Sequence, residues 1–266
     1  MRLLVSVASA AEASAALLGG ADIIDAKDPL SGALGPVSID VLREIHVACA
    51  RARTVTAALG DAADEADVER SARAFSTAGA TFVKVGFAGI ASAARVESLI
   101  AAAVRGAGVA GTPHRATVRL KPDTTDEGGV IAVAYADAER VASVSLFEVL
   151  DAAARGGARG VLVDTADKHG PGLRHLVAPD VLGAWIANAH EHGLLAAVAG
   201  KLVADDLPLV RDLGANIAGV RGAACEAGRN GCVVADKVRV LRARCNFAGG
   251  DPQHPAKAGH YVRLRT

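Results

Sequence analysis

The sequence predicts an α/β fold, a (β/α)₈ barrel in a single domain. Short apolar, β-branched runs alternate with longer Ala- and Leu-rich stretches, and this alternation repeats eight times. The short runs are almost continuously apolar, which is typical of parallel strands buried on both faces. No G-x-G-x-x-G follows the first run, which disfavours an open dinucleotide-binding sheet. A barrel of about 250 residues is a common single domain, so the length also fits.

The elements follow in order along the chain. The first strand is followed by an amphipathic stretch that runs through Leu18 and ends at Gly19 and Gly20. Ser38 is placed to cap a helix that extends to about Ala52, because a serine side chain accepts a bond from an orphan N–H of the first turn. Further helices are expected over about 66–77, 91–104 and 233–244. The eight expected strands cover 3–7, 22–26, 54–59, 81–85, 130–134, 160–163, 194–198 and 216–220.

Two segments break this alternation. Residues 105–129 are rich in Gly and Pro and fall between the fourth helix and the fifth strand. Helix-to-strand connections lie on the face of a barrel away from its active site, so an insertion there is tolerated. The aperiodic segment 246–266 is expected to be a poorly ordered C-terminal extension that could contact another subunit of a homo-oligomer. The catalytic barrel domain is therefore expected to span 1–245.

Composition excludes several classes of function. The 29 Lys and Arg residues balance 29 Asp and Glu residues, and only 3% of the residues are aromatic, which argues against nucleic-acid binding. No apolar run reaches the ~20 residues of a membrane helix. The apolar N-terminal run is interpreted as a buried strand rather than as a signal peptide. The cysteines form no C-x-x-C pair, so we expect free thiols in the cytoplasm and no metal site.

Lysines gather where the predicted strands end. The second strand ends with Asp25 and Lys27, the fourth with Lys84, and the sixth with Asp164 followed by Lys168. The carboxyl ends of barrel strands form the active-site face, so these side chains are expected to meet. Clustered ammonium groups repel, which favours a neutral amine that can attack a carbonyl to give an imine. An ordinary Asp–Lys ion pair at a strand end is the simpler alternative.

A second group of residues indicates a phosphate site. Gly200 follows the seventh strand, and Arg221, Gly222 and Ala223 follow the eighth. Barrels commonly bind phosphate with these two loops, where glycines let backbone N–H groups approach and an arginine adds a bidentate contact. The alternative is a plain Gly-rich turn that closes the barrel. Asp137 is a further candidate at the mouth, whereas Cys225 is expected to pack beneath the phosphate loop.

Seven stretches of the chain, taken together, resemble one known family. They occur in order from about Leu3 to Cys225, and the pairing of ADIIDAKDP with GVRGAAC is quite specific. The family is (5-formylfuran-3-yl)methyl phosphate synthase, also called 4-(hydroxymethyl)-2-furancarboxaldehyde-phosphate synthase. The insertion and the C-terminal tail depart from its shorter archaeal pattern. The stretches are LLVSV, GGADIIDAKDPLSGALG, FVKVGFAG, AYADAERV, VDTADKHG, LAAVAGKL and GVRGAAC.

The resemblance implies a TIM barrel lyase that condenses two molecules of glyceraldehyde 3-phosphate to a furan aldehyde phosphate, with loss of phosphate and water. It implies a place in methanofuran-type cofactor biosynthesis and one-carbon metabolism. By matching positions, Lys27 is the imine-forming (Schiff-base) lysine, Lys84 the proton acceptor, and Asp164 and Lys168 supporting acid–base groups. Asp25 is added from strand geometry. No cofactor is expected. The second phosphate is left open among Lys201, Arg174 and a neighbouring subunit.

Two other readings stay open on the sequence alone. The lysines and the glycine loop also suit a simpler imine-forming aldolase that acts on another sugar phosphate. A non-catalytic barrel that binds a metabolite is the third possibility. Release of phosphate separates the first two, and loss of function on replacing Lys27 or Lys84 separates both from the third.

Overall fold

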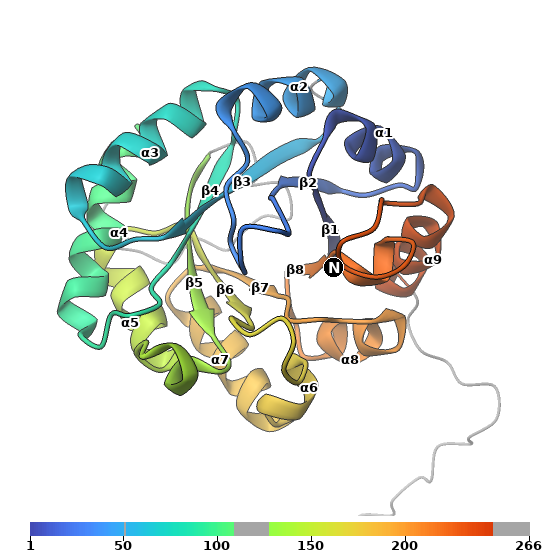
Figure 1. Cartoon of the computed structure of the whole chain (residues 1–266). Coiled ribbons are helices and arrows are strands. Elements are labelled where there is room, and N and C mark those ends of the chain that lie inside the picture. Colours follow the sequence, from blue (N-terminus) through green and yellow to red (C-terminus); the bar gives the residue numbers. More distant parts are fainter. Residues whose placement is uncertain (51, 109–127, 247–266) are drawn as a thin grey trace, which may run out of the picture.

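The computed structural model describes residues 1–50, 52–108 and 128–246, and it shows a closed barrel. Each strand is parallel to the next, and β8 pairs with β1 to close the sheet. The predicted fold is therefore confirmed, and every predicted strand is present with its ends shifted by two residues at most. Figure 1 shows the strands at the centre of the molecule. They are β1 (Arg2–Val7), β2 (Ile23–Ala26), β3 (Thr54–Asp61), β4 (Phe82–Gly86), β5 (Gly129–Tyr135), β6 (Gly160–Asp164), β7 (Leu195–Val198) and β8 (Ile217–Val220).

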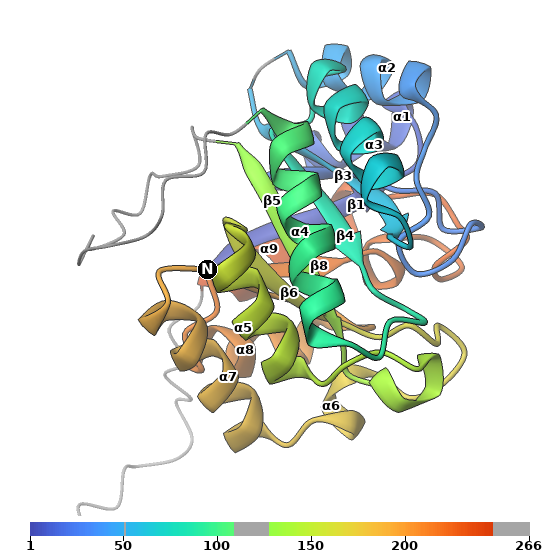
Figure 2. The same cartoon turned by 90° about the vertical axis from the view of Figure 1, so that its left-hand side faces the viewer.

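Helices surround the strands. In Figure 2, α3, α4 and α5 lie side by side over the sheet. Short 3₁₀ helices, among them η3 (Gly222–Ala224), occupy loops after the strands. The α-helices of the described residues are α1 (Ala10–Leu18), α2 (Ile39–Cys49), α3 (Glu65–Thr77), α4 (Ala93–Ala107), α5 (Leu146–Gly156), α6 (Leu173–Leu176), α7 (Pro179–Glu191), α8 (Leu207–Asp212) and α9 (Ala235–Asn246).

Local sequence sets where several helices begin and end. The side chain of Ser38 accepts the N–H of Val41, as expected for an N-cap, and Asp64 caps α3 in the same way. The helix begun at Ser38 ends at Cys49, three residues before the predicted end. Ala50 takes a left-handed φ of 45° there and donates its N–H to the carbonyl of Val47, which stops the helix.

The predicted insertion begins later than expected. Helix α4 continues through Arg105 to Ala107 and ends at Gly108, whose φ of 71° suits glycine. Gly129, predicted as the last residue of the insertion, opens β5. The rest of the insertion, 109–127, and the tail residues 247–266 lie outside the described residues. The limits of the barrel domain and the role of the tail therefore stay predictions.

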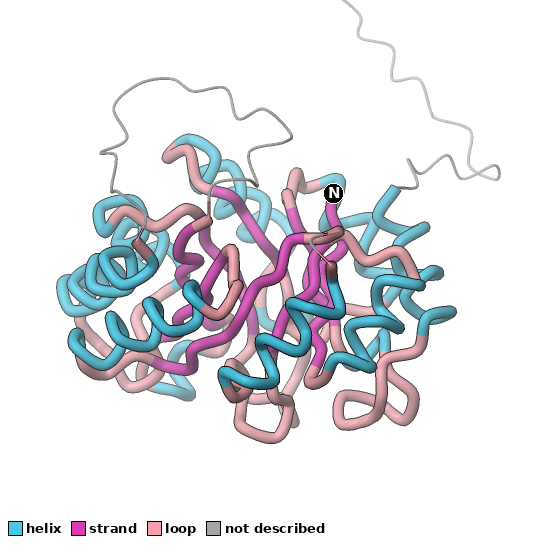
Figure 3. Tube along the Cα trace, turned by 90° about the horizontal axis from the view of Figure 1, so that it is seen from above, coloured by secondary structure: helices cyan, strands magenta, loops and turns pink. Residues whose placement is uncertain are grey.

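Buried side chains form two layers because successive residues of a strand face opposite sides of the sheet. The larger layer lies between the strands and the helices, and Figure 3 shows this arrangement of strands between helices. The smaller layer fills part of the barrel interior, with Leu4, Phe82 and Leu162 among its members. Within the described ranges, no helix is both long and apolar enough to cross a membrane.

Candidate active site

Asp25 lies at the centre of a buried polar network inside the barrel. Its ladder partners on β1 and β3 are Ser6 and Thr56, which share its inward face. Both hydroxyls donate to the carboxylate, at 2.7 Å each, and Lys84 Nζ donates to Oδ2 at 2.6 Å. Burial acts to raise the pKa of Asp25, but the charges of Lys84 and Lys27 and the hydrogen bonds from Lys84 and Thr56 outweigh it and hold the pKa below its usual range. Asp25 is therefore an ionised, fully buried anchor for Lys84.

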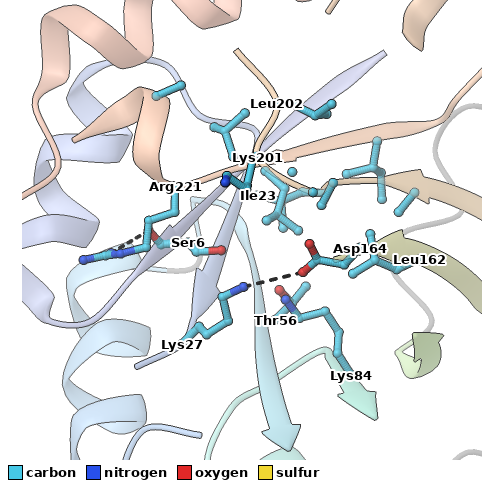
Figure 4. A pocket seen from close by; sticks show the side chains of 18 of the residues that line it. Ser6, Ile23, Lys27, Thr56, Lys84, Leu162, Asp164, Lys201, Leu202 and Arg221 are labelled. Carbon is cyan, nitrogen blue, oxygen red and sulfur yellow. Dashed lines mark hydrogen bonds and ion pairs between the residues drawn. The ribbon is translucent and has the colours of Figure 1, made fainter. Parts of the chain in front are cut away.

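Lys27 follows β2 directly and extends its ladder, because its N–H donates to the carbonyl of Val7. Its side chain is 7% exposed, and Nζ lies 4.0 Å from Asp164 Oδ2. Figure 4 shows this pair beside Lys84. Burial lowers the pKa of Lys27 to about 7, helped by the charges of Lys84 and Lys168 against the opposing effect of Asp164 and Asp25. A large fraction of this amine is therefore neutral near pH 7.

Asp164 holds the third lysine. Lys168 Nζ donates to Asp164 Oδ1 at 2.6 Å and lies 3.4 Å from Thr165 Oγ1, and the N–H of Thr165 donates to the same carboxylate oxygen at 2.8 Å. Burial opposes ionisation of Asp164, but Lys168, Lys27 and these donors outweigh it and lower its pKa. The structure thus brings together all five residues that were predicted as catalytic.

The three lysines are not equivalent. Lys84 and Lys168 each donate a short hydrogen bond, of 2.6 Å, to a carboxylate. Lys27 donates no side-chain hydrogen bond within the described ranges, and its ion pair is the longest of the three. The amine that is free to attack a carbonyl is therefore the one with the lowered pKa.

The loops after β7 and β8 form the opposite wall of the cavity. Gly200 has a φ of 100°, and a Cβ there would come within 3.0 Å of Leu173 Cβ, so this position requires glycine. Gly222 and Ala223 begin η3, and their backbone N–H groups have no partner among the described residues. Gly200, Gly222 and Ala223 all line the cavity, so the wall presents unpaired N–H donors of the kind that bind phosphate.

Arg221 differs from the expectation of a bidentate phosphate contact. Its Nη1 and Nη2 donate to Glu12 at 2.8 and 3.2 Å, and they also reach the carbonyls of Ser6 and Gly231, while Nε donates to the carbonyl of Arg229. A guanidinium has five N–H groups, and all five are used. Figure 4 shows the side chain extending away from Lys27 and Lys84. Arg221 therefore fixes the β8 loop instead of offering a fork to an anion.

Other candidates have structural roles. Asp137 accepts the N–H groups of Ala166 and Asp167 at 2.7 and 2.8 Å and so orders the loop after β6. Cys225 is buried, which raises the pKa of its thiol and makes it a poor nucleophile. In the part of the chain that the structure describes, no group of His, Cys, Asp and Glu could hold a metal ion.

The two residues proposed for a second phosphate are both engaged. Arg174 pairs with Asp206 at 3.6 Å and does not line the cavity. Lys201 lines the cavity, and its Nζ donates to the carbonyl of Gly170 at 2.5 Å. The contacts of these two side chains therefore give no indication of a second anion site.

Sequence reasoning missed several supporting residues. Ser6 and Thr56 are hydroxyls within apolar runs, and only the ladder register shows that they flank Asp25. Arg229 also lines the cavity, and its Nη2 donates to the carbonyls of Pro29 and Gly32 at 3.1 and 2.7 Å. This contact ties the loop after β8 to the loop after β2 across the mouth.

The whole arrangement encloses one cavity of about 270 Å³. Lys27, Lys84, Asp164 and Lys168 line one side of it, and the loops of β7 and β8 line the other. An amine with a pKa of about 7 thus shares a pocket with the ionised carboxylate of Asp164 and with backbone N–H donors. This combination suits imine and proton-transfer chemistry on a substrate that carries an anionic group.

Known proteins resemble this chain over most of its length. A family model described as 4-HFC-P synthase matches residues 3–242. The (5-formylfuran-3-yl)methyl phosphate synthase of Methanopyrus kandleri is 38% identical over 243 residues, which cover 90% of this chain and 97% of that protein. The synthase of the same name from Methanocaldococcus jannaschii is 32% identical over 251 residues, with 92% and 100% covered.

Solved structures support the fold alone. A 3-hexulose-6-phosphate synthase superposes with a TM-score of 0.59 at 23% identity and covers 92% of this chain and 99% of its own. Phosphoribosyl anthranilate isomerase from Thermus thermophilus gives a TM-score of 0.58 at 15% identity, with 92% and 98% covered. The family model and the two synthases confirm the family resemblance that the sequence motifs indicated. The chain is a member of the 4-HFC-P synthase family, the enzyme family of the (5-formylfuran-3-yl)methyl phosphate synthases.

Proposed function

We propose that this enzyme condenses two molecules of glyceraldehyde 3-phosphate to (5-formylfuran-3-yl)methyl phosphate through an imine on Lys27. The observation that carries the proposal is the Lys27 amine, which has a pKa of about 7, donates no hydrogen bond to the described residues and faces a cavity with an N–H-lined wall. Such an amine can be neutral and nucleophilic at the pH where its neighbours Lys84 and Lys168 are held by carboxylates.

The first steps follow from the positions of the lysines. The neutral Nζ of Lys27 attacks the carbonyl carbon of a triose phosphate, the C–N bond forms and water leaves. The imine draws electrons from the adjacent carbon and so acidifies its C–H. Lys84 is proposed to give a proton to the hydroxyl that leaves as water and then, as a neutral amine, to accept the proton from that carbon. Asp25, at 2.6 Å, stabilises the charged amine that results.

The later steps use the second ion pair. The resulting enamine carbon attacks the aldehyde of a second triose phosphate, and a C–C bond forms. Asp164 and Lys168 are proposed to donate and accept protons at the oxygens that leave as phosphate and water, since Lys168 is close to both Asp164 and the cavity. The N–H groups of Gly222 and Ala223, with Gly200 on the same wall of the cavity, are proposed to hold the phosphate that is retained.

The product also suggests a cellular role. A furan that carries a formyl group and a phosphomethyl group is proposed to enter methanofuran-type cofactor synthesis in the cytoplasm, within one-carbon metabolism. This assignment follows from the family resemblance.

Turnover and covalent trapping test the proposal together. Purified enzyme incubated with glyceraldehyde 3-phosphate is expected to produce a furan absorbance and free phosphate in equal amounts. Borohydride added during turnover is expected to leave the substrate carbon on the peptide that contains Lys27. Release of phosphate with no furan, or label on a different lysine, would contradict the proposal. Trapping on Lys27 with no phosphate release would instead favour an aldolase that acts on another sugar phosphate.

A further inference from the structure

The cavity continues below the lysines into the barrel interior, and we call this deeper part the shaft. Barrel interiors are ordinarily packed with layers of side chains from alternate strands. Here the cavity that begins at Lys27 and Lys84 also reaches residues in the amino-terminal halves of the strands. The apolar residues that define the shaft are Leu4, Ile23, Phe82, Ile131, Leu162, Leu195 and Ile217.

Missing side-chain volume on β7 and β8 keeps the shaft open. On the opposite side of the barrel, Thr56 and Lys84 fill the interior, whereas the corresponding wall carries Ala197, Ala199 and Gly219. A Cβ on Gly219 would lie 3.3 Å from Ala199 Cβ and 3.6 Å from Leu4 Cδ2. A single added methyl group would therefore fill the space between these two side chains. The shaft is therefore an opening made by small residues beneath the reactive amine.

Apart from Arg2, which also lines the cavity and has a partner of its own, the side chains of the shaft offer the proposed substrate no hydrogen bond. Every carbon of a triose phosphate carries an oxygen, so such a molecule loses hydration without gaining apolar contact there. A furan ring, in contrast, is flat and largely apolar. An apolar cavity of about 150 Å³ accommodates benzene, and the cavity here, mouth included, is about 270 Å³. The cavity as a whole thus has room for one five-membered aromatic ring with its substituents at the mouth.

We propose that the shaft is a binding site for the furan ring of the aromatic product, held while its formyl carbon is within reach of Lys27. This inference rests on the proposed function. In that product the formyl and phosphomethyl groups sit on ring atoms separated by one ring carbon. Both groups can therefore face the mouth, one toward Lys27 and the other toward Gly222 and Ala223, while the opposite edge of the ring enters the shaft.

Binding of the ring has a chemical consequence. The formyl group of the bound furan can react with the neutral Nζ of Lys27, so that a C=N bond forms and water leaves. The product is then bonded to the Lys27 amine, with which the first substrate must react. The enzyme is expected to be inhibited by planar aromatic aldehydes, competitively with glyceraldehyde 3-phosphate.

Furfural, which is a furan aldehyde without phosphate, is the probe that isolates the shaft. Borohydride transfers hydride to the imine carbon and a proton from water completes the amine, which fixes the aldehyde on the lysine. Unphosphorylated glyceraldehyde is the non-aromatic comparison. In the unaltered enzyme, furfural is expected to label Lys27 at half-saturating concentrations at least about tenfold lower than glyceraldehyde, because only the ring buries apolar surface.

Filling the shaft should remove that preference. In Ala197→Leu, the ratio of the two half-saturating concentrations is expected to move toward unity by about tenfold, and the smaller change Gly219→Ala should shift it in the same direction. Ala187→Leu, the same chemical change on the exposed face of α7, is the control and should leave the ratio unaltered. Thermal unfolding of each variant shows whether it is folded.

The outcomes separate this proposal from the function on which it rests. Furfural that labels Lys27 no better than glyceraldehyde, or a preference that survives in a folded Ala197→Leu enzyme, would overturn the shaft as a ring site. If both filling variants fail to fold, the preference in the unaltered enzyme still decides. Failure to make a furan from glyceraldehyde 3-phosphate, with the furfural preference intact, would reject the proposed function and leave the ring site standing.

Discussion

The two sides of the barrel mouth are built from different parts of the chain. On the side of β2, β4 and β6, the cavity faces charged side chains in buried pairs, such as Lys84 with Asp25 and Lys168 with Asp164. On the side of β7 and β8, it faces backbone N–H groups and small residues such as Gly222. Side chains of the first kind can exchange protons, whereas peptide N–H groups cannot. We infer that one side performs the chemistry and the other holds the substrate.

The largest expected effect comes from removing the free amine. Lys27→Ala should lower kcat by at least about 10⁴-fold, since a covalent nucleophile has no substitute in the site. Binding of inorganic phosphate, measured by calorimetry, should change far less, because the N–H donors of Gly222 and Ala223 lie on the other side. Phosphate affinity that falls in parallel with kcat would contradict this division between the two sides.

Removing one partner of the buried pair of Lys84 and Asp25 should lower the free energy of unfolding more than replacing both partners. Lys84→Met leaves a buried carboxylate unpaired and is expected to lower the free energy of unfolding by about 3–5 kcal/mol. The double variant that adds Asp25→Asn should recover much of this loss, while kcat stays about 10²–10⁴-fold below that of the unaltered enzyme. Urea unfolding and initial rates measure the two effects separately.

An exposed pair provides the matched control for that experiment. Arg43 and Asp40 lie 2.9 Å apart on the surface of α2, with 61% and 85% of their side chains exposed. Arg43→Met is expected to change stability by less than about 1 kcal/mol because solvent already screens this pair. If Lys84→Met and Arg43→Met lower the free energy of unfolding equally, burial of the active-site pair does not contribute to its effect on stability.

On the β7–β8 side, the corresponding test is Glu12, which holds Arg221 and also accepts the N–H of Ala8 at 2.7 Å. Glu12→Ala leaves the Arg221 guanidinium buried and unpaired, so a loss of about 3–5 kcal/mol in unfolding free energy is expected. Weaker phosphate binding should accompany it, with the pH profile of Lys27 trapping preserved. Glu148 occupies the same position of the first turn in α5 but is exposed, and Glu148→Ala should cost only about 1 kcal/mol.

The charged side of the mouth could be predicted from sequence to a large extent. A residue at the carboxyl end of a barrel strand has a known destination, so recognising the strands was enough to place Lys27, Lys84 and Asp164 together. The hydroxyls that flank Asp25 were not found, because a serine or threonine inside an apolar run gives no sign of its ladder partner. Register, which sets that partner, depends on the whole sheet.

The β7–β8 side was harder to predict for a physical reason. Arg221 follows a strand and sits in a glycine loop, which favours an anion contact, but its carboxylate partner Glu12 is 209 residues away and no local pattern links them. The shaft was missed because it depends on side chains that are absent. Ala197 and Gly219 suit a buried strand equally well whether the space beside them is filled or empty.

The smallest effect expected is a shift in pH dependence, and it also distinguishes the two sides. The pKa of Lys27 is about 7, so the rate of borohydride trapping should rise with pH through that value as the amine loses its proton. Asp164 raises this pKa and Lys168 lowers it. Asp164→Asn should therefore move the midpoint down and Lys168→Met should move it up, each by about one unit. Gly222→Ala, which adds no charge, should leave the midpoint in place. A midpoint that stays in place in both charge variants would show that burial alone, and not the arrangement of charges, sets the pKa of this amine.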